Sequence, residues 1–304
     1  MRLTMRAPTK LTMCCAAALF TLIAIVFAPS AKADTTCDTL LTSGTGTTFL
    51  KNCISKDGNV VAFESPQDAE HIAVGNIVGS IEEGYAICQG DAQHPLVHGF
   101  DVGQYEYGFG ASTVLQPNGP NTLPLTITRD TDDGLRLKQS FARNTAEKEL
   151  TITMTLSNVS ASTAFNVQLI RFVDFNTNGS PRQDIFYKTQ GTVIADKAIS
   201  FNFVDDGILT GIALTGLTYP ISHFSAVEPY VDWLPPSGPP PAGFAECNAK
   251  NVRATPTDGH YIDPANPPDA APPPGDYAGR VTYSFGNMAP GASKTVKVRY
   301  GTLQ

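Results

Sequence analysis

The chain has 304 residues, with 21 Lys+Arg against 28 Asp+Glu and a formal net charge of −7 at pH 7. Hydrophobic residues make up 42% of it, which is enough for a sizeable core. An acidic chain with no run of basic residues repels DNA and RNA, so the composition argues against nucleic-acid binding.

The first 33 residues have the three parts of a secretory signal peptide. Basic residues come first, an apolar run follows from Met13 to Phe27, and the small-residue segment Ala28–Ala33 ends in Ala-Lys-Ala. We therefore expect cleavage after Ala33 and a secreted or periplasmic mature protein. The apolar run is shorter than the ~20 residues that span a bilayer. No later segment is long and apolar enough, so we expect no transmembrane segment after cleavage.

Four cysteines follow the leader: Cys37, Cys53, Cys88 and Cys247. An even number in an oxidising compartment predicts two disulfides, and three pairings are open. We favour Cys37–Cys53, which closes a short loop, together with Cys88–Cys247. A zinc site is the alternative, but no Cys-x-x-Cys pair supports it.

Alternating apolar and polar residues predict β-strands along most of residues 34–304. Asp57-Gly58 marks a hairpin between Cys53-Ile54 and Val60–Phe63. The runs 123–127 and 135–141 alternate on either side of the turn 130–134, and 150–156 alternates Leu, Ile and Met with Thr.

Apolar residues occupy both faces of the run 165–172, which suits a central strand. Residues 281–285 and 296–300 alternate around Ala289-Pro-Gly-Ala292, which predicts a C-terminal hairpin. The Pro-rich stretch 234–275 cannot supply central strands and is expected to be a long surface insertion. The fold class is therefore all-β, a single domain over 34–304 that forms a large antiparallel two-sheet sandwich.

Two stretches resemble immunoglobulin-like β-sandwich modules of bacterial surface and secreted proteins. One runs from the Thr-rich strand at Leu150 through Asn158-Val-Ser160 to Ala164-Phe-Asn-Val167, and the other is Gly286–Val296. More than a hundred residues separate them here, whereas such modules are compact. A larger sandwich, like those of sugar epimerases and polysaccharide-active enzymes, suits the chain length better.

The segment Asp174-Phe-Asn-Thr-Asn-Gly179 resembles the start of a calcium loop. Oxygen-bearing side chains alternate before a glycine, and a further acid follows. The predicted Ca²⁺ ligands are Asp174, Asn176, Asn178 and Asp184. The alternative is an Asx-rich turn after a strand, and Ca²⁺ is the one cofactor that the sequence suggests.

Other candidate residues lie in aromatic and histidine-bearing segments. Aromatic side chains can stack on sugar rings while neighbouring carboxylates accept sugar hydroxyls, although the same residues also cover sandwich ends. The predicted ligand-binding residues are Tyr105, Glu106, Tyr107, Tyr230, Asp232 and Trp233. The candidate acid–base residues are His98, Tyr107, His223 and His260, since such chemistry needs a matched acid and base.

Three functions remain open on the sequence. The first is a non-catalytic binding protein outside the cytoplasm, whose partner is a glycan or a cell-surface protein. The second is a secreted carbohydrate-active enzyme of the polysaccharide-lyase or sugar-epimerase type, and the third is a structural surface protein. No Gly-x-Ser-x-Gly, His-Glu-x-x-His or phosphate-loop motif is present, so whether the protein is an enzyme stays open.

Overall fold

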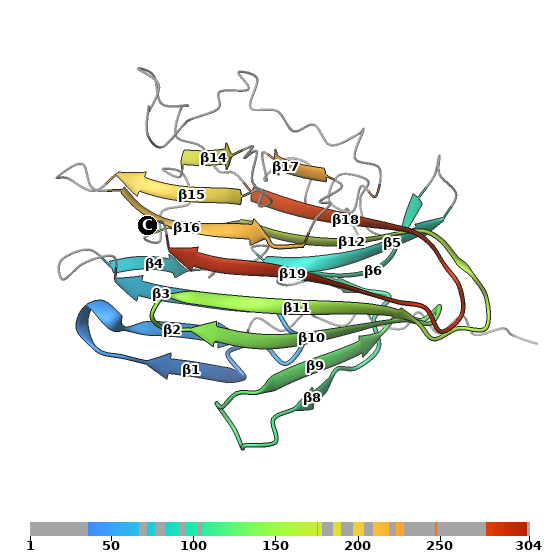
Figure 1. Cartoon of the computed structure of the whole chain (residues 1–304), viewed down its shortest axis with the longest axis horizontal. Helices are drawn as coiled ribbons and strands as arrows, with labels where there is room; N and C mark the ends of the chain where they lie inside the picture. Colours follow the sequence, from blue (N-terminus) through green and yellow to red (C-terminus); the bar gives the residue numbers. More distant parts are fainter. Residues whose placement is uncertain are drawn as a thin grey trace, which may run out of the picture.

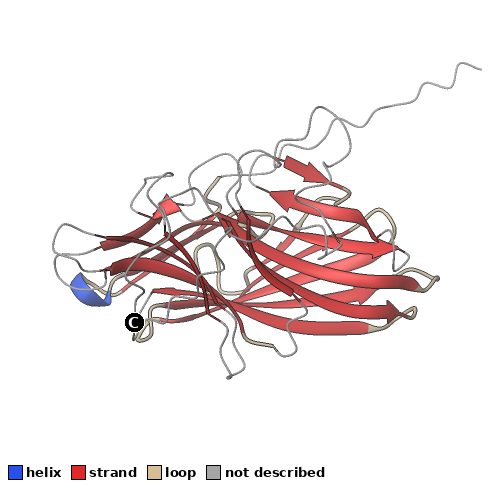
Figure 2. Cartoon of the chain, turned by 90° about the horizontal axis from the view of Figure 1, so that it is seen from above, coloured by secondary structure: helices blue, strands red, loops and turns tan. Residues whose placement is uncertain are grey.

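The computed structural model describes residues 36–66, 72–76, 83–90, 95–102, 105–174, 176–177, 185–189, 197–203, 209–218, 223–227, 247 and 278–302. Within these ranges the elements are β-strands, apart from the short 3-10 turn η1 (Gly46–Thr48) (Figure 2). The paired strands run antiparallel, which confirms the predicted all-β class. No helix in the described part of the chain is long and apolar enough to cross a membrane.

The strands form three sheets (Figure 1). The eight-stranded sheet has the order β14 (Ile185–Thr189), β15 (Lys197–Phe203), β16 (Leu209–Gly216), β19 (Ser293–Thr302), β11 (Glu149–Asn158), β10 (Leu135–Asn144), β9 (Leu125–Asp130), β8 (Thr113–Leu115). The six-stranded sheet has the order β17 (His223–Val227), β18 (Ala278–Met288), β12 (Ala164–Asp174), β5 (Glu83–Gly90), β6 (Pro95–Val102), β7 (Tyr105–Tyr107). The five-stranded sheet has the order β1 (Thr39–Ser43), β2 (Leu50–Ile54), β3 (Val60–Pro66), β4 (Ile72–Asn76), β13 (Asn176–Thr177).

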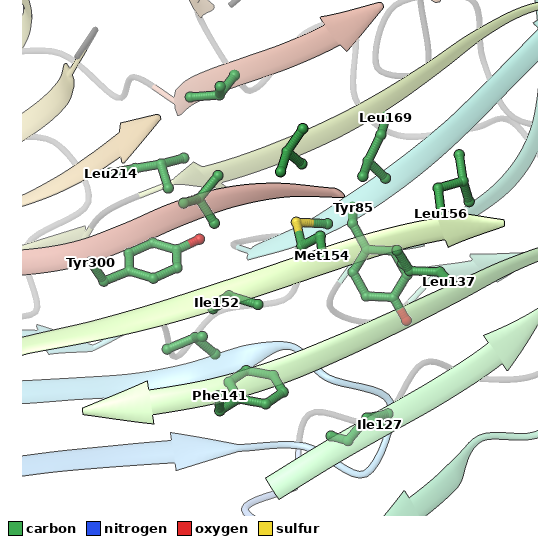
Figure 3. Close-up of a cluster of buried hydrophobic side chains, with 14 of the residues drawn as sticks. Tyr85, Ile127, Leu137, Phe141, Ile152, Met154, Leu156, Leu169, Leu214 and Tyr300 are labelled. Carbon is green, nitrogen blue, oxygen red and sulfur yellow. The ribbon is translucent and has the colours of Figure 1, made fainter. Parts of the chain in front are cut away.

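One continuous hydrophobic core joins the three sheets. Side chains alternate between the two faces of a strand, so each strand contributes every second residue to the core. In β11 the apolar residues of the predicted run, such as Ile152 and Met154, point inward (Figure 3). The threonines between them are less buried and lie on the other face of the strand. Ile152 and Met154 share one core with Tyr85 and Leu169 of the six-stranded sheet, so the predicted sandwich is present. The five-stranded sheet is a third sheet that the predicted two-sheet arrangement did not include.

Strand β12 is central in the six-stranded sheet, as its two apolar faces predicted. Val167 and Leu169 belong to the main core, while Ile170 and Phe172 are buried on the opposite face. Phe165 departs from the expected pattern and is 54% exposed. It precedes Asn166, whose φ of 49° accompanies a β-bulge in the pairing of β12 with β18.

Both favoured disulfides are present. Cys37 pairs with Cys53, and Cys88 pairs with Cys247, with Cα–Cα distances of 5.3 and 5.6 Å. Cys88 lies on β5, and Cys247 is buried beside it. The second bond therefore fixes one point of the predicted Pro-rich insertion against the six-stranded sheet; the rest of that insertion lies outside the described residues.

The predicted C-terminal hairpin is wrong, although its two strands are correct. β18 pairs with β12 and β17, whereas β19 pairs with β11 and β16 in the other sheet. The turn at Ala289–Ala292 therefore carries the chain across the sandwich instead of joining neighbours. β18 and β19 form their hydrogen bonds with neighbours in different sheets. Both strands nevertheless contribute apolar side chains to the common core.

A second crossing lies directly beside this one. The segment that follows Asn158 leads from β11 in one sheet to β12 in the other, and Asn158 N–H donates to the carbonyl of Ala292. The buried Asn158 amide also donates to the carbonyls of Ser162 and Met288, at 2.7 and 2.8 Å. The two stretches that carry the immunoglobulin-like resemblance are thus joined in space.

Candidate functional site

A buried turn from the five-stranded sheet enters the centre of the sandwich. Residues 55–59 connect β2 to β3, and only Lys56 among them is exposed. Buried backbone groups need partners, and both large sheets supply them. The carbonyl of Asp57 accepts from Tyr85 Oη at 2.6 Å and from Gln139 Nε2 at 3.3 Å. The carbonyl of Gly58 accepts from Arg171 at 3.2 Å.

On one side of this turn, three carboxylates surround a single guanidinium. Arg129 of β9 donates to Asp101 of β6 at 2.5 Å and is ion-paired with Glu106 of β7. Asp57 Oδ1 lies 3.9 Å from the same guanidinium. Arg129 also donates to the carbonyl of Gly110, and all four charged residues are buried. We call Asp57, Asp101, Glu106 and Arg129 the Arg129 cluster.

The Arg129 cluster has more acids than bases, and the shifted pKa values reflect this. Burial raises the pKa of Asp101 well above its ordinary value; Arg129 opposes the shift, and Asp57 and Glu106 add to it. Burial likewise raises the pKa of Glu106 against the opposing charge of Arg129. The pKa of Arg129 is raised because its charged neighbours outweigh its own desolvation. The cluster therefore favours protonation of a carboxyl group.

The three acids lie close enough together to bind a metal ion, but Arg129 already supplies the positive charge between them. Ligand oxygens of Asp57, Asp101 and Glu106 lie within 4.8 Å of one another, a spacing that a divalent cation would accept. The guanidinium already contacts two of them and supplies the positive charge. We interpret the cluster as a structural ion-pair group.

A second buried group lies on the other side of the turn and ties the three sheets together. Arg171 of β12 is fully buried and ion-paired with Glu83 of β5. Tyr300 of β19 donates to Glu83 Oε1 at 2.6 Å, and Val60 N–H of β3 donates to Glu83 Oε2 at 2.8 Å. Arg171 also donates to Gln139 of β10 at 2.6 Å. This group contains one basic residue, Arg171, and one acidic residue, Glu83, so their formal charges cancel.

The half-exposed polar group at the surface is His98 with Asp133. His98 lies on β6 beside a β-bulge in the β5–β6 pairing, and its Nδ1 contacts the carboxylate of Asp133 in the turn between β9 and β10. Thr131 and Gln89 also donate to Asp133. Burial would raise the pKa of Asp133, but the hydrogen bonds from His98 and Thr131 lower it overall. Nδ1 of His98 is the ring nitrogen held by Asp133, so Nε2 is the ring nitrogen outside this contact.

Tyr107 is an exposed aromatic residue on an edge strand. It pairs in register with Phe100, and the two rings stack with centroids 6.1 Å apart and planes 24° apart. Tyr107 is 45% exposed, whereas Phe100 beside it on β6 is 9% exposed. The adjacent Glu106 points into the Arg129 cluster, since neighbouring strand residues face opposite ways.

The structure therefore separates residues that the sequence grouped. Tyr107 contacts Phe100 and His98 contacts Asp133, so these two candidate acid–base residues have different side-chain partners. Glu106 is committed to Arg129. Tyr105 and His223 are described as strand backbone, paired with Val102 and Thr282.

The other predicted site residues are only partly described. Asp174 ends β12, where it pairs with Ala278, and Asn176 pairs with Asn76 in the five-stranded sheet. Their side chains are not described, and Asn178, Asp184, Tyr230, Asp232, Trp233 and His260 lie outside the described residues, as does the predicted leader 1–33. The calcium site stays a prediction.

The comparisons with known proteins give a likeness of fold alone. No protein-family model and no curated protein matches the chain. A bacterial glucoamylase, solved in complex with acarbose, superposes with a TM-score of 0.55 at 10% identity, over 91% of this chain and 34% of that one. A polysaccharide lyase gives a TM-score of 0.46 at 9% identity, over 88% of this chain and 33% of that one. The chain thus spans about a third of the length of these structures.

Proposed function

We propose that the protein is a glycan-binding β-sandwich protein that works outside the cytoplasm, and that Tyr107 is its sugar-stacking residue. The exposed Tyr107 ring supported by Phe100 carries the proposal. An aromatic ring whose orientation is restrained by a neighbouring ring offers its exposed face to a sugar ring and loses little side-chain entropy on binding. The two disulfides support a location outside the reducing cytoplasm.

A glycan array with the mature protein tests the proposal. Tyr107→Ala should weaken binding about fivefold, because an aromatic contact contributes about 1 kcal/mol, while Tyr107→Phe keeps the ring and most of the affinity. Phe165→Ala removes another exposed aromatic residue and is the matched control. Equal binding by wild type and Tyr107→Ala would remove Tyr107 from the site, and an array without any bound glycan would contradict the function itself.

A second function, proton transfer in a carbohydrate-active enzyme, is favoured by the His98–Asp133 pair. A half-exposed imidazole whose Nδ1 contacts a carboxylate is oriented for general-base chemistry at Nε2. Incubation with uronic-acid polymers should then produce new absorbance from unsaturated chain ends, and His98→Ala should abolish it. Glycan binding without any such absorbance would favour the binding protein over the enzyme.

A further inference from the structure

The outer face of the eight-stranded sheet carries an ordered array of hydroxyl and amino groups. The strand register aligns Thr128, Lys138, Thr155 and Thr295 in one row across β9, β10, β11 and β19. The next row aligns Thr126, Ser140, Thr153 and Lys297. These eight residues face away from the core, because the residues between them are the buried ones. We call them the hydroxyl–lysine face, and Figure 1 shows the four strands side by side.

The charges at the edges of this face are already paired. Arg136 donates to both oxygens of Asp130, at 2.7 and 2.8 Å, and Arg299 contacts Glu149 at 2.6 Å. Lys138 and Lys297 are exposed, and neither has an acidic partner among the residues that the structure describes. In a chain with a net charge of −7, this face thus presents two unneutralised cations.

We propose that the hydroxyl–lysine face binds a linear anionic polysaccharide, with Lys138 and Lys297 as the charge contacts. Ser and Thr hydroxyls both donate and accept hydrogen bonds, as sugar hydroxyls do. Neighbouring strands lie ~4.8 Å apart and same-face residues ~6.8 Å apart. The two lysines are two strands and one row apart, so their Cα atoms are separated by about 12 Å.

This spacing favours a polymer with fewer charges per unit length than a nucleic acid. Duplex DNA carries one charge per ~1.7 Å, and two cations neutralise little of it. Anionic membranes attract clusters of about four to eight basic residues, whereas only two are unpaired here. Salt screens interactions between charges more than ~8 Å apart at physiological ionic strength. The chain's net negative charge therefore weakens the long-range attraction of an anionic polymer more than it weakens the polymer's contacts with Lys138 and Lys297. The proposed surface lies on the sheet opposite Tyr107 and does not depend on it.

Native gel electrophoresis with polygalacturonate in the gel tests the proposal. The wild type should be retarded by this polymer and not by neutral dextran, and the retardation should fall as salt is added. Lys138→Gln/Lys297→Gln should raise the Kd about tenfold, from the loss of two exposed ion pairs. The control Lys51→Gln/Lys56→Gln changes the net charge equally on the five-stranded sheet and its turn, and should bind like the wild type.

Several outcomes would overturn the proposal. One is migration of the wild type unaffected by polygalacturonate, and another is equal weakening in the two double variants, which indicates a general charge effect. Binding to phosphatidylserine vesicles without polymer binding would assign the face to a membrane instead. Phe165→Ala changes an exposed aromatic residue on β12 of the other sheet and should leave polygalacturonate binding unchanged. Loss of binding in Phe165→Ala would transfer the site to that sheet. Circular dichroism of the variants checks that these surface changes leave the fold intact.

Discussion

Replacing Arg129 by methionine should destabilise the protein strongly at neutral pH. The change leaves three buried acids around an uncharged side chain that replaces only the aliphatic part of the arginine. Breaking a buried ion pair in this way costs about 3–5 kcal/mol. Arg136→Met is the matched control, because Arg136 forms a bidentate pair with Asp130 on the surface of the same hairpin. Exposed pairs contribute about 0–1 kcal/mol, so this variant should be close to the wild type.

Urea denaturation followed by circular dichroism at pH 7 and pH 4 measures both free energies of unfolding. Arg129→Met should lose less at pH 4, because protonation of Asp101 and Glu106 removes the charges that Arg129 no longer balances. A loss within about 1 kcal/mol of the control at pH 7 would show that the cluster is hydrated or protonated throughout. A larger loss at pH 4 than at pH 7 would contradict the electrostatic explanation itself.

Three further predictions concern the same core. The folded-state pKa of Asp101 lies above its unfolded value, so its contribution to stability is complete below about pH 4 and is lost as the pH rises; thermal melts of the wild type against Asp101→Asn should show a shallower alkaline decline in the variant. Gly58→Ala should lower the free energy of unfolding, measured by chemical denaturation, by about 2 kcal/mol, because φ is +97° and a Cβ would lie 2.3 Å from a side-chain amide. Gly291→Ala is the control: φ is +78° but nothing lies near the added Cβ, so the loss should be smaller. Removing Cys88–Cys247, which spans 159 residues, should lower stability by about 5 kcal/mol against about 3 kcal/mol for the 16-residue Cys37–Cys53 loop, and equal losses would contradict the chain-entropy model.

Strand positions could be predicted from the sequence because alternation is a local property. The runs 135–141 and 150–156 fall in β10 and β11, and the run 123–127 begins two residues before β9 and overlaps its first half. Within these strands the inward residues are those that the pattern assigned to the core. Pairing is not local, and here the prediction failed once. A Pro-Gly turn between two alternating runs suits a hairpin within one sheet and a crossing between two sheets equally well. The crossing is determined by the strands with which the two runs pair: β19 pairs with β11 in one sheet, and β18 pairs with β12 in the other.

The buried charges were missed although their signal is in the sequence. Arg129 follows Leu125 and Ile127 at the same strand parity, and Arg171 follows Val167 and Leu169 in the same way. An arginine at an inward position needs an acid from elsewhere in the fold. Their partners Asp101 and Glu83 come from strands far away along the chain, so no spacing rule connects them. The surface rows of the eight-stranded sheet were missed for a similar reason, since they depend on the register of four strands.

The position of β19 bears on how the molecule can be synthesised. It lies between β11 and β16, so the strands made earliest in that sheet meet the later ones only through residues 293–302. While a ribosome is still translating the middle of the chain, both halves keep open strand edges, which are prone to pair with other chains. A chain that ends before Ser293 would lack β19, so the facing edges of β11 and β16 would stay unpaired. Completion of this sheet should therefore wait until residues 293–302 have been made, and chains truncated before Ser293 should depend on holding chaperones.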